Sequence, residues 1–588
     1  MRRRPSTSAA KFACLFLAFA SRTAPAGDAL GPLSIRGPEG PIERLARAEF
    51  TIAGVPEAEN PFDPDEIAVD ATLRGPSGKE LRIPAFYARD YERSLEGGRE
   101  VLRLAGEPGW RLRLAALEPG PHELRVEARI AGKPAASGSR RLDVRPGGGA
   151  GFVRVEPRRR RYFQLDDGSP LFLVGLCASW HDARGTYDYD DWLAAYERAG
   201  INYIRIWMWH HAFGIEWDRE DRTRYRLDRA WTLDRVLAEA ERRGIRVMLC
   251  LDYHGILETK PDFWGGNDFW PRHPYNAANG GPCATQNDFF TSPEARKLYR
   301  KRLRYIVARW SAFPGILAWQ FFNEIDNVYR YLKPEDVAAW HRDMARDLRE
   351  LDPYGHLITT SLTGKSERRE IWEIPELDFA QYHSYNEERP ARVTARVASG
   401  FFERYRKPVF VGEYGTDFRG WKPETDPHLR ALHQAVWSGA FAGAAGTAMS
   451  WWWQSIHEAG RYGSWASLSA FLRGTGAGSG EFEPLPAKPE GEVAVEAFAV
   501  GSKREALLWL LDPRYSWPQG ALEDPPSPCS GARVAIEGPE DAAYAVEWWD
   551  PAGGRSLGRV EVEARGGKLV LSPDPFRADL AARIRRAP

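Results

Sequence analysis

Cysteine is scarce in this sequence, and its spacing excludes several kinds of site. The chain has five cysteines in 588 residues, and no two of them stand in CxxC spacing. This pattern argues against a zinc site and against a disulfide framework. Four thiols lie beyond the N-terminal segment, at Cys177, Cys250, Cys283 and Cys529. Cys177 and Cys250 fall in neighbouring predicted strands, where they could be buried free thiols or form a single bridge.

An excess of either charge is also missing. The chain carries 81 Lys and Arg against 81 Asp and Glu, so its formal net charge at pH 7 is zero. General binding to nucleic acid or to a membrane surface needs an excess of positive charge, so we expect neither partner. A hydrophobic content of 43% is typical of a core-forming chain and not of a disordered one.

Long apolar runs are absent as well. The N-terminus reads Met1-Arg-Arg-Arg4, followed by nine apolar residues from Phe12 to Ala20 and by Ala24-Pro25-Ala26. Nine residues are too few for a helix to cross roughly 30 Å of hydrocarbon. A charged start, a short apolar run and an A-x-A site are the features of an export signal. We therefore predict a signal peptide over residues 1–26, secretion or a periplasmic location, and no membrane insertion.

Aromatic residues, in contrast, are abundant, with 23 Trp, 22 Tyr and 27 Phe. Flat aromatic faces stack on sugar and other rings, although most such residues fill cores. Around them the chain divides into three regions. Residues 27–148 hold short alternating runs broken by Pro and Gly, which predict an Ig-like β-sandwich domain. Residues 152–474 repeat strand, loop and helix, and residues 475–588 return to short strands.

The middle region predicts a (β/α)₈ barrel, because eight apolar strand candidates alternate with helical patterns. We therefore predict an α/β fold, a TIM barrel flanked by an N-terminal β-sandwich and a small C-terminal β domain. Helices are expected over Asp190–Ala199 and Thr232–Arg243, each followed by a glycine, and after the Ser292-Pro293-Glu294 cap. The eight strand candidates are Pro170–Trp180, Ile201–Trp209, Arg246–His254, Ile316–Glu324, Leu357–Gly364, Leu377–Tyr385, Pro408–Tyr414 and Gly446–Trp453.

Two carboxylates stand at strand ends, where the active site of such a barrel lies. Glu324 and Glu413 each follow an apolar strand, and an unpaired charge there would be costly. One such glutamate is commonly a buried salt-bridge partner. Two of them, with Arg, His and Tyr at the ends of other strands, favour a catalytic site.

Paired carboxylates that face one cavity are what glycosidic hydrolysis requires. One must be protonated to donate to the leaving oxygen, and the other must be ionised to attack the anomeric carbon. Their surroundings must push the two pKa values apart. We expect Arg205 to keep Glu413 ionised by its opposite charge, and an apolar or like-charged setting to keep Glu324 protonated.

Six motifs follow one another along the predicted strands. They are Arg205 in INYIRIW, His254 in LDYHG, the pair Asn323 and Glu324, the pair His383 and Tyr385, Glu413 in FVGEYG, and a tryptophan of the eighth strand. In this order they resemble the clan A glycoside hydrolases, and within that clan family 5, the cellulase and β-mannanase group, over residues 152–474.

The resemblance implies a retaining enzyme that works without cofactor or metal. Glu324 would be the general acid and base, and Glu413 the nucleophile. Asn323 would bind the sugar 2-hydroxyl, while Arg205 and Tyr385 would hold the nucleophile.

The resemblance also implies residues that line the −1 subsite, where the cleaved sugar sits. His254 and His383 would line it, and a tryptophan of the eighth strand would form its floor. Strand alternation places Trp451 and Trp453 on the same face, and we expect Trp453, as the one nearer the rim, to be the floor.

One loop departs from the usual short connection of about 2–6 residues. Residues 255–291 form a long segment after the third strand, with Trp264, Gly265, Trp270 and Tyr275 among its residues. Such a loop could wall a cleft and stack sugars, or it could pack on the rim of the barrel.

The leading hypothesis is an exported O-glycosyl hydrolase that acts as a monomer on β-linked polysaccharide. The substrate type, β-1,4-mannan or β-glucan, comes from the resemblance alone. Two alternatives stay open. The first is an exo-acting glycosidase on side-chain sugars, whose cleft the long loop would close at one end. The second is a non-catalytic carbohydrate-binding protein, which the presence of both carboxylates argues against.

Overall fold

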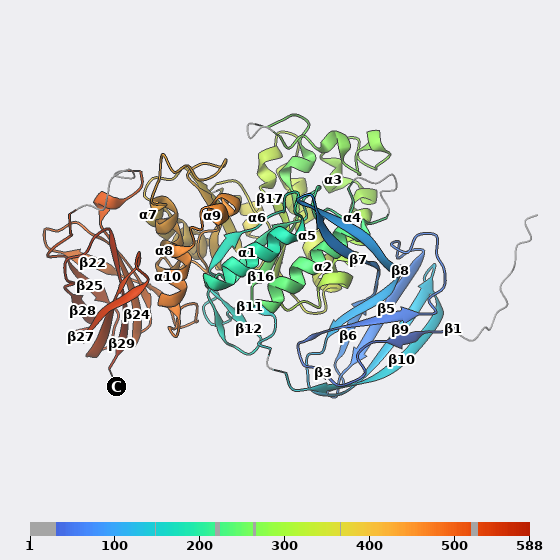
Figure 1. Cartoon of the computed structure of the whole chain (residues 1–588), viewed down its shortest axis with the longest axis horizontal. Coiled ribbons are helices and arrows are strands. Elements are labelled where there is room, and N and C mark those ends of the chain that lie inside the picture. Colours follow the sequence, from blue (N-terminus) through green and yellow to red (C-terminus); the bar gives the residue numbers. More distant parts are fainter. Residues whose placement is uncertain are drawn as a thin grey trace, which may run out of the picture.

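The computed structural model describes residues 31–147, 149–217, 224–262, 266–364, 366–518 and 527–587. Strands occupy a first region up to Arg145, strands and helices alternate in a central region from Gly175 to Leu472, and strands return in a last region from Glu483. Figure 1 shows the first and last regions at opposite ends of the molecule, with the helices between them. The predicted signal peptide, residues 1–26, lies outside the described residues.

Two mostly antiparallel sheets form the first region and enclose an apolar cluster between them. Strand β5 alternates buried and half-buried residues, as a strand with one face on a core does. The sheets run β1-β10-β9-β5-β6, with β3 beside β10, and β2-β4-β8-β7. The bounds are β1 Gly31–Pro32, β2 Ser34–Arg36, β3 Ile42–Glu43, β4 Arg47–Ala53, β5 Ile67–Arg74, β6 Glu80–Pro84, β7 Phe86–Glu96, β8 Arg99–Ala115, β9 Gly120–Ile130 and β10 Lys133–Arg145.

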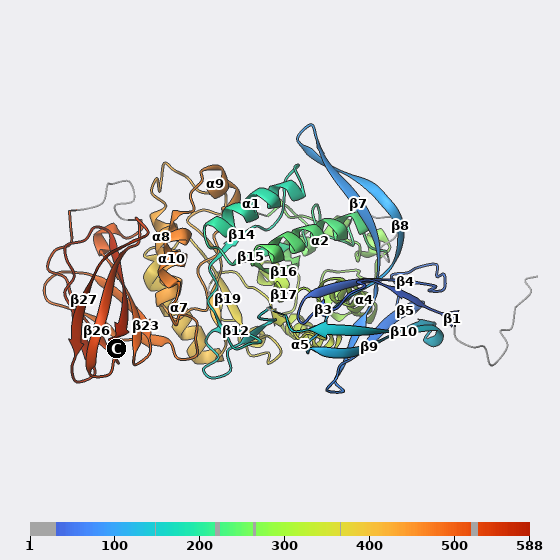
Figure 2. The same ribbon diagram turned by 60° about the horizontal axis from the view of Figure 1, so that its bottom comes forward.

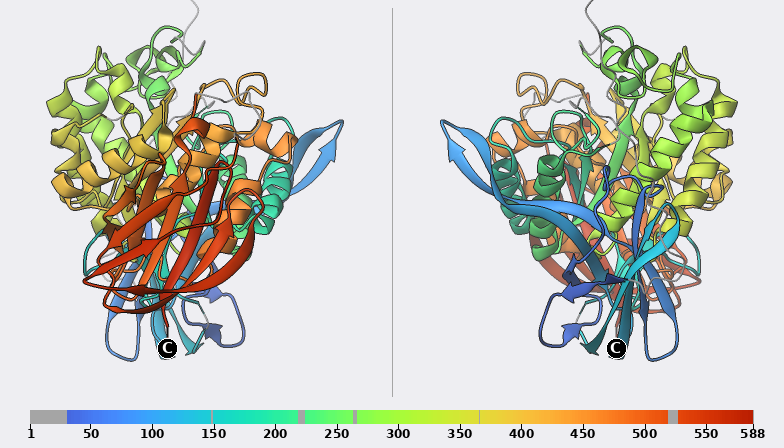
Figure 3. Two further views of the ribbon diagram at one scale, coloured as in Figure 1. Left: turned by 90° about the vertical axis from the view of Figure 1, so that its left-hand side faces the viewer. Right: turned by 90° about the vertical axis from the view of Figure 1, so that its right-hand side faces the viewer.

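Strands β7 and β8 form a long hairpin that extends beyond the first region. Its outer half lies beside helices α1 (Thr186–Arg198) and α2 (Leu227–Arg242) of the central region (Figures 2 and 3). Tyr91 of the hairpin meets Trp231 of α2, with ring centroids 6.1 Å apart. Because of this hairpin, the first region contacts the central region along its helices.

Parallel strands alternate with helices in the central region. Strands pair in the order β14-β15-β16-β17-β18, and β19 pairs with β20. Residues 445–451 hydrogen-bond to both ends of this series: the Met449 N–H donates to the Val411 oxygen, and the Cys177 N–H donates to the Ser450 oxygen. Strands β16, β17 and β20 are buried almost throughout, as parallel strands covered on both faces are. The predicted α/β class is confirmed.

The elements of the central region follow the predicted order. A small sheet precedes them, with β11 Val153–Val155, β12 Phe163–Leu165 and β13 Pro170–Leu171. The strands are β14 Gly175–Cys177, β15 Tyr203–Trp207, β16 Arg246–Tyr253, β17 Ile316–Asn323, β18 Leu357–Thr359, β19 Ala380–Tyr385 and β20 Val409–Gly415. The other α-helices are α3 Asp288–Thr291, α4 Pro293–Trp310, α5 Pro334–Leu351, α6 Arg369–Trp372, α7 Pro390–Tyr405, α8 Arg430–Phe441, α9 Trp453–Glu458 and α10 Gly463–Leu472, with 3₁₀ turns η1 His254–Leu257, η2 Trp270–Arg272, η3 Ala277–Asn279 and η4 Ile325–Val328.

Local signals located several helices but not every strand. Ser292 caps α4 by accepting a hydrogen bond from the Ala295 N–H at 3.3 Å. Helices α1 and α2 begin four and five residues before the predicted starts at Asp190 and Thr232. The predicted strand Gly446–Trp453 is wrong as a regular strand: it forms isolated bridges only, and helix α9 begins at Trp453.

The last region consists of two sheets around a third apolar cluster. They run β21-β23-β24-β29-β26-β27 and β22-β25-β28. The bounds are β21 Glu483–Leu485, β22 Ala487–Glu490, β23 Glu496–Gly501, β24 Glu505–Leu511, β25 Arg533–Glu537, β26 Ala542–Asp550, β27 Arg555–Ala564, β28 Lys568–Leu571 and β29 Asp579–Arg586, with the turn η5 Pro513–Tyr515. Strand β29, which the sequence analysis did not predict, lies between β24 and β26.

Two further expectations concern the cysteines and the membrane. Cys177, Cys250, Cys283 and Cys529 are all buried free thiols, so the alternative of a bridge between Cys177 and Cys250 is wrong. Within the described ranges, no helix combines the length and the apolar character needed to cross a bilayer.

Candidate active site

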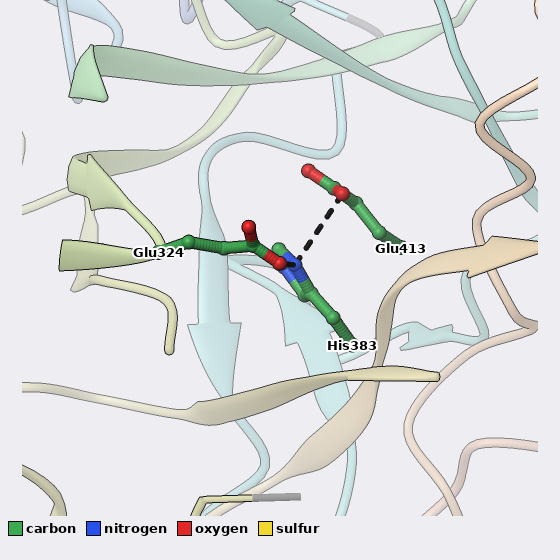
Figure 4. A group of neighbouring side chains, drawn as sticks. All are labelled: Glu324, His383 and Glu413. Carbon is green, nitrogen blue, oxygen red and sulfur yellow. Dashed lines mark hydrogen bonds and ion pairs between the residues drawn. The ribbon is translucent and has the colours of Figure 1, made fainter. Parts of the chain in front are cut away.

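Glu324 and Glu413 meet at the C-terminal ends of two parallel strands. Glu324 directly follows β17, and Glu413 lies near the end of β20; they are 7% and 4% exposed. One oxygen of each carboxylate and a ring nitrogen of His383 all lie within 4.8 Å of one another (Figure 4). Retaining glycosidases hold their carboxyl groups about 5–5.5 Å apart and inverting ones about 6.5–9.5 Å. The nearest oxygens of Glu324 and Glu413 are therefore closer together than the inverting range.

Glu324 is held in an unusual backbone conformation. Its φ of 49° is left-handed, which costs energy for a residue other than glycine and clusters at functional sites. Its N–H donates to the Ser361 hydroxyl at 3.1 Å, and the Asn327 amide donates to Oε2 at 2.8 Å. Burial raises the pKa of Glu324, although the nearby charges of His254 and Arg205 oppose this effect. The site therefore favours a protonated Glu324.

Glu413 accepts hydrogen bonds on both oxygens. The guanidinium of Arg205 donates to Oε1 at 2.5 Å, and the Tyr385 hydroxyl donates to Oε2 at 2.9 Å. Arg205 also donates to Gln320 at 2.9 Å and to Asn323 at 2.6 Å. Burial alone would lower the pKa of Arg205, but the charge of Glu413, its hydrogen bond and the neighbouring Cys250 and Cys177 together outweigh burial and raise it. The guanidinium beside Glu413 therefore stays charged.

His383 lies between the two carboxylates, as Figure 4 shows. Its Nδ1 is 2.6 Å from an oxygen of Glu324 and 3.4 Å from an oxygen of Glu413. Burial lowers the pKa of His383 to about 4, so its ring is neutral near pH 7. His254 follows β16, which pairs with β17 so that Tyr253 lies beside Asn323. The Nε2 atom of His254 is 3.6 Å from Asp262.

Trp451 is more exposed than Trp453, whereas we expected Trp453 to lie nearer the rim. Trp453 is only 1% exposed, whereas Trp451 is half-buried. Strand alternation does not reach Trp453, because helix α9 begins there. The Trp451 ring lies 5.1 Å from that of Trp207, over which the Arg205 guanidinium sits at 5.2 Å. Trp451 is therefore the better candidate for a sugar contact.

Three half-buried tryptophans form what we call the tryptophan wall: Trp180, Trp209 and Trp451. Trp180 stacks on Trp209 at 4.5 Å between centroids and meets Trp451 edge-on at 5.4 Å. Trp209 in turn stacks on Tyr253 at 4.3 Å. The sequence analysis missed Trp180 and Trp209 as site residues. The signal was present, because each ends a predicted strand.

Three polar residues that hold the site were also missed. Gln320 accepts from Arg205, Ser361 donates to Asn323 at 3.2 Å, and Asn327 donates to Glu324. A fully buried glutamine in the otherwise apolar strand ILAWQFFN is a usable signal. Ser361 and Asn327 lie in loops and carry no comparable signal.

Two aromatic residues of the long loop after β16 pack inside the protein. Trp270 and Tyr275 are buried, and the Tyr275 hydroxyl donates to Glu216 at 3.1 Å. Trp264 and Gly265, which the sequence analysis singled out, lie outside the described residues. For Trp270 and Tyr275, the packing alternative is therefore the better one.

Glu324, His383 and Glu413 have the spacing of a possible metal site. Their present partners suit a carboxylate pair better than a cation. The Arg205 guanidinium already bonds to Glu413, and a second positive charge there would be repelled. These contacts therefore favour a carboxylate pair that acts without a bound cation.

Comparison with known proteins finds mannan endo-1,4-beta-mannosidases among the sequence relatives. No protein-family model matches the chain. The chain is 25% identical to mannan endo-1,4-beta-mannosidase 1 of Oryza sativa subsp. japonica over 367 residues, which is 53% of this chain and 79% of that protein. It is 23% identical to mannan endo-1,4-beta-mannosidase 7 of Arabidopsis thaliana over 363 residues, with the same coverages.

One solved structure shares the fold along most of the chain. It is a candidate glycoside hydrolase from Bacteroides vulgatus ATCC 8482, with a TM-score of 0.61 and 15% identity over 93% of this chain and 100% of that one. Fold, paired carboxylates and sequence relatives together define the class of this protein as glycoside hydrolase. Within that class, the predicted resemblance to the cellulase and β-mannanase group is confirmed by relatives that are mannan endo-1,4-beta-mannosidases.

Proposed function

We propose that this chain is a retaining endo-β-glycanase that cleaves β-1,4-linked mannan or a closely related β-glucan. The single observation that carries the mechanism is the spacing of Glu324 and Glu413, one oxygen of each lying within 4.8 Å of the other. A gap of this size accommodates one anomeric carbon and its leaving oxygen, but no additional water molecule. The mannan preference rests on the names of the sequence relatives.

The reaction proceeds in two displacements. In the first, an oxygen of Glu413 attacks the anomeric carbon while Glu324 gives its proton to the departing glycosidic oxygen. The product is an ester between the sugar and Glu413, and the released half of the polymer carries a new hydroxyl. In the second, Glu324 takes a proton from water, the water oxygen attacks the same carbon, and Glu413 leaves as a carboxylate.

The surrounding residues position the sugar and the nucleophile. The Asn323 oxygen accepts from Arg205 and Ser361, and its amide N–H groups are assigned to the sugar 2-hydroxyl. Arg205 and Tyr385 hold Glu413, and His383 holds Glu324. We assign the floor of the −1 subsite to Trp451, and His254 lines its side.

The proposal includes the organisation of the chain. A signal peptide over residues 1–26 directs secretion, an Ig-like β-sandwich covers residues 27–148, a (β/α)₈ barrel covers 152–474 and a C-terminal β domain covers 475–588. Hydrogen bonds of residues 445–451 to both β14 and β20 support closure of the barrel. Apolar clusters made mostly of the first and of the last region support these two as domains of their own. We expect the enzyme to act as a monomer.

Product analysis on a panel of polysaccharides tests this proposal. Mannan, glucomannan, β-glucan, xylan and cellulose would be incubated with the enzyme and with its Glu413→Gln variant. We expect oligosaccharides of mixed length from mannan and glucomannan, and none from the variant. Release of single sugars only would favour the exo-acting alternative. Binding to mannan without hydrolysis of any polysaccharide would favour the non-catalytic alternative.

A further inference from the structure

A carboxylate from the first region lies at the N-terminal end of helix α1. Glu100 of β8 accepts a hydrogen bond from the Thr186 N–H at 3.0 Å and another from the Thr186 hydroxyl. The helix's own cap residue is Gly185, which has no side chain for this purpose. The first N–H groups of a helix lack partners in the helix and favour a negative charge. The hairpin therefore supplies the cap that the helix itself does not carry.

The fit between the hairpin and the helix start is close. A Cβ atom at Gly185, whose φ is 60°, would lie only 2.0 Å from an oxygen of Glu100 and 2.7 Å from its Cβ. The Glu100 N–H also donates to the Ala183 oxygen at 3.0 Å. The backbone and side chain of Glu100 both bond at the start of the helix, and the absence of a side chain at Gly185 leaves room for them. The contact is therefore specific.

A second hairpin residue strengthens the contact. Arg93 of β7 donates to the Thr186 hydroxyl at 2.7 Å and to Asp190 at 2.5 Å. Its guanidinium also lies 4.0 Å from the centre of the Tyr187 ring. Arg93 and Glu100 are 14% and 7% exposed, so water competes little for these bonds.

The loop that this contact fixes carries part of the tryptophan wall. Residues 178–185 connect β14 to α1 and include Trp180, which stacks on Trp209. The loop is held at its start by Tyr189, whose hydroxyl donates to the Ala178 oxygen at 2.6 Å. At its end it is held by Glu100. Figure 2 shows the outer half of the hairpin beside α1.

We propose that Glu100 and Arg93 are positioning residues of the active site. They hold the loop 178–185 in a position in which Trp180 can stack on a sugar. The first region thereby contributes to glycan binding. This inference rests on the proposed function, which assigns Trp451 of the same wall to the −1 subsite. Loss of the clamp weakens glycan binding but leaves the bond-breaking step at Glu324 and Glu413 intact.

The test compares Glu100→Ala with Glu96→Ala in the full chain. Glu96 lies on the same hairpin and bonds only to Ser94 and Arg103 of that hairpin in the contacts described, so it is a matched control. Hydrogen–deuterium exchange of residues 178–190 should rise in Glu100→Ala and not in Glu96→Ala. KM for mannan oligosaccharides should rise about threefold to tenfold, the size of one aromatic contact. Turnover of an activated aryl glycoside should change less than twofold.

Other outcomes separate this inference from the proposed function. Unchanged exchange in a folded Glu100→Ala variant would overturn the clamp, as would raised exchange with an unchanged KM. Raised exchange in a protein whose wild type cleaves no glycan would refute the proposed function and leave the clamp contact standing. If Glu100→Ala does not fold, Glu100→Gln keeps the volume and one accepting oxygen, and smaller shifts of the same sign are expected.

Discussion

Glu324 and Glu413 are chemically the same residue, and their partners make them different. Glu413 receives hydrogen bonds from a charged guanidinium and a phenol. Glu324 is bonded to a neutral imidazole and an amide, and burial raises its pKa. Partners that differ in this way let one carboxyl group act as the acid and the other as the nucleophile.

The acid role of Glu324 predicts a dependence on the leaving group. General acid catalysis contributes about 10²–10⁴-fold, so Glu324→Ala should lose about that much activity on mannan. An aryl glycoside with an acidic phenol needs no proton to leave, and its first step should be almost unaffected. Burst kinetics with both substrates measure this difference. Equal losses on the two substrates would assign the acid to another residue.

The raised pKa of Glu324 predicts the basic limb of the pH profile. The acid must be protonated to act, so kcat/KM falls as pH rises through the pKa of Glu324. Because burial raises this pKa above the ordinary value of 4.5, activity persists at a higher pH than a free glutamic acid would allow. With mannan oligosaccharides, whose departure needs the proton, the basic limb should vanish in the residual activity of Glu324→Ala. A limb that stays in place in the variant would contradict the assignment.

Charged residues in apolar strands could be predicted as site residues, and loop residues could not. Arg205, Glu324 and Glu413 stand out because burial of an unpaired charge is costly, so each implies a partner. Ser361 acts through its place beside Asn323, which depends on how the loop after β18 folds. Trp453 was misplaced because a helix begins where the sequence analysis continued a strand.

At the scale of elements, helix α8 must approach the segment 445–451 closely. A Cβ at Gly439 of α8 would lie 2.6 Å from the Gly446 oxygen and 2.9 Å from the Thr447 Cα, both backbone atoms. Gly439→Ala would therefore push the helix away from the segment that carries Trp451. Overpacking of this kind typically costs 1–3 kcal/mol. We expect a loss of about that size, measured by urea denaturation.

Gly400 in helix α7 is the matched control for Gly439. A Cβ there would meet no atom within 4 Å. Alanine is more favourable than glycine inside a helix by about 0.8–1 kcal/mol, so Gly400→Ala should stabilise the protein. Opposite signs for the two substitutions would support close packing of α8. If neither substitution destabilises the protein, the close packing of α8 against the segment 445–451 would be contradicted.

Local signals predicted some elements well and missed one central strand. Gly200 and Gly244 follow the ends of α1 and α2, and Pro293 begins α4, because these residues suit helix ends in any context. Strand β29 reads DLAARIRR, whose Ala, Leu and Arg are good helix formers. It is a strand because β24 and β26 pair with it on both sides, and tertiary pairing outweighs local preference.

At the scale of the whole molecule, one buried ion cluster joins the first region to the central one. Asp234 of α2 accepts from Arg113 of β8 at 2.6 and 2.8 Å and from Arg309 of α4 at 2.8 and 3.1 Å. The Trp310 indole also donates to it at 2.7 Å. Removing this carboxylate would leave two guanidinium groups buried without their shared partner.

Asp234→Asn should therefore destabilise the protein strongly. Breaking a buried pair by removal of one partner costs about 3–5 kcal/mol, and urea unfolding measures the loss. Asp228→Asn, on the same helix, is the control, because Asp228 pairs with Arg226 at the surface and such pairs contribute about 0–1 kcal/mol. Similar losses in both variants would show that Asp234 does not join the regions.

The same carboxylate predicts how stability depends on pH. Burial alone would raise the pKa of Asp234, but Arg113 and Arg309 lower it below the ordinary 3.8. The folded-state pKa is thus depressed, so this contribution is present above about pH 4 and is lost as pH falls further. Unfolding measured between pH 6 and pH 3 should show a smaller loss on acidification in Asp234→Asn than in the wild type.

The order of the regions could be predicted from the sequence, whereas their contacts could not. Pro146–Gly151 marks the change from alternating runs to strand–helix repeats, and the last strand of the first region ends at Arg145. Arg113 gave no sign of a partner 121 residues away, because such pairs depend on which faces dock. The position of the hairpin along α1 and α2 also depends on which faces dock, so it could not be predicted from the sequence.

The proposed mechanism depends above all on Glu413 as the nucleophile, whose oxygen forms the covalent bond to the sugar. An activated 2-deoxy-2-fluoro-β-mannoside slows the second displacement, so the first intermediate accumulates and its peptide can be identified by mass spectrometry. We predict that the added sugar mass lies on the peptide that contains Glu413. A protein that hydrolyses mannan with inversion at the anomeric carbon, or that carries the label on another residue, would contradict this account.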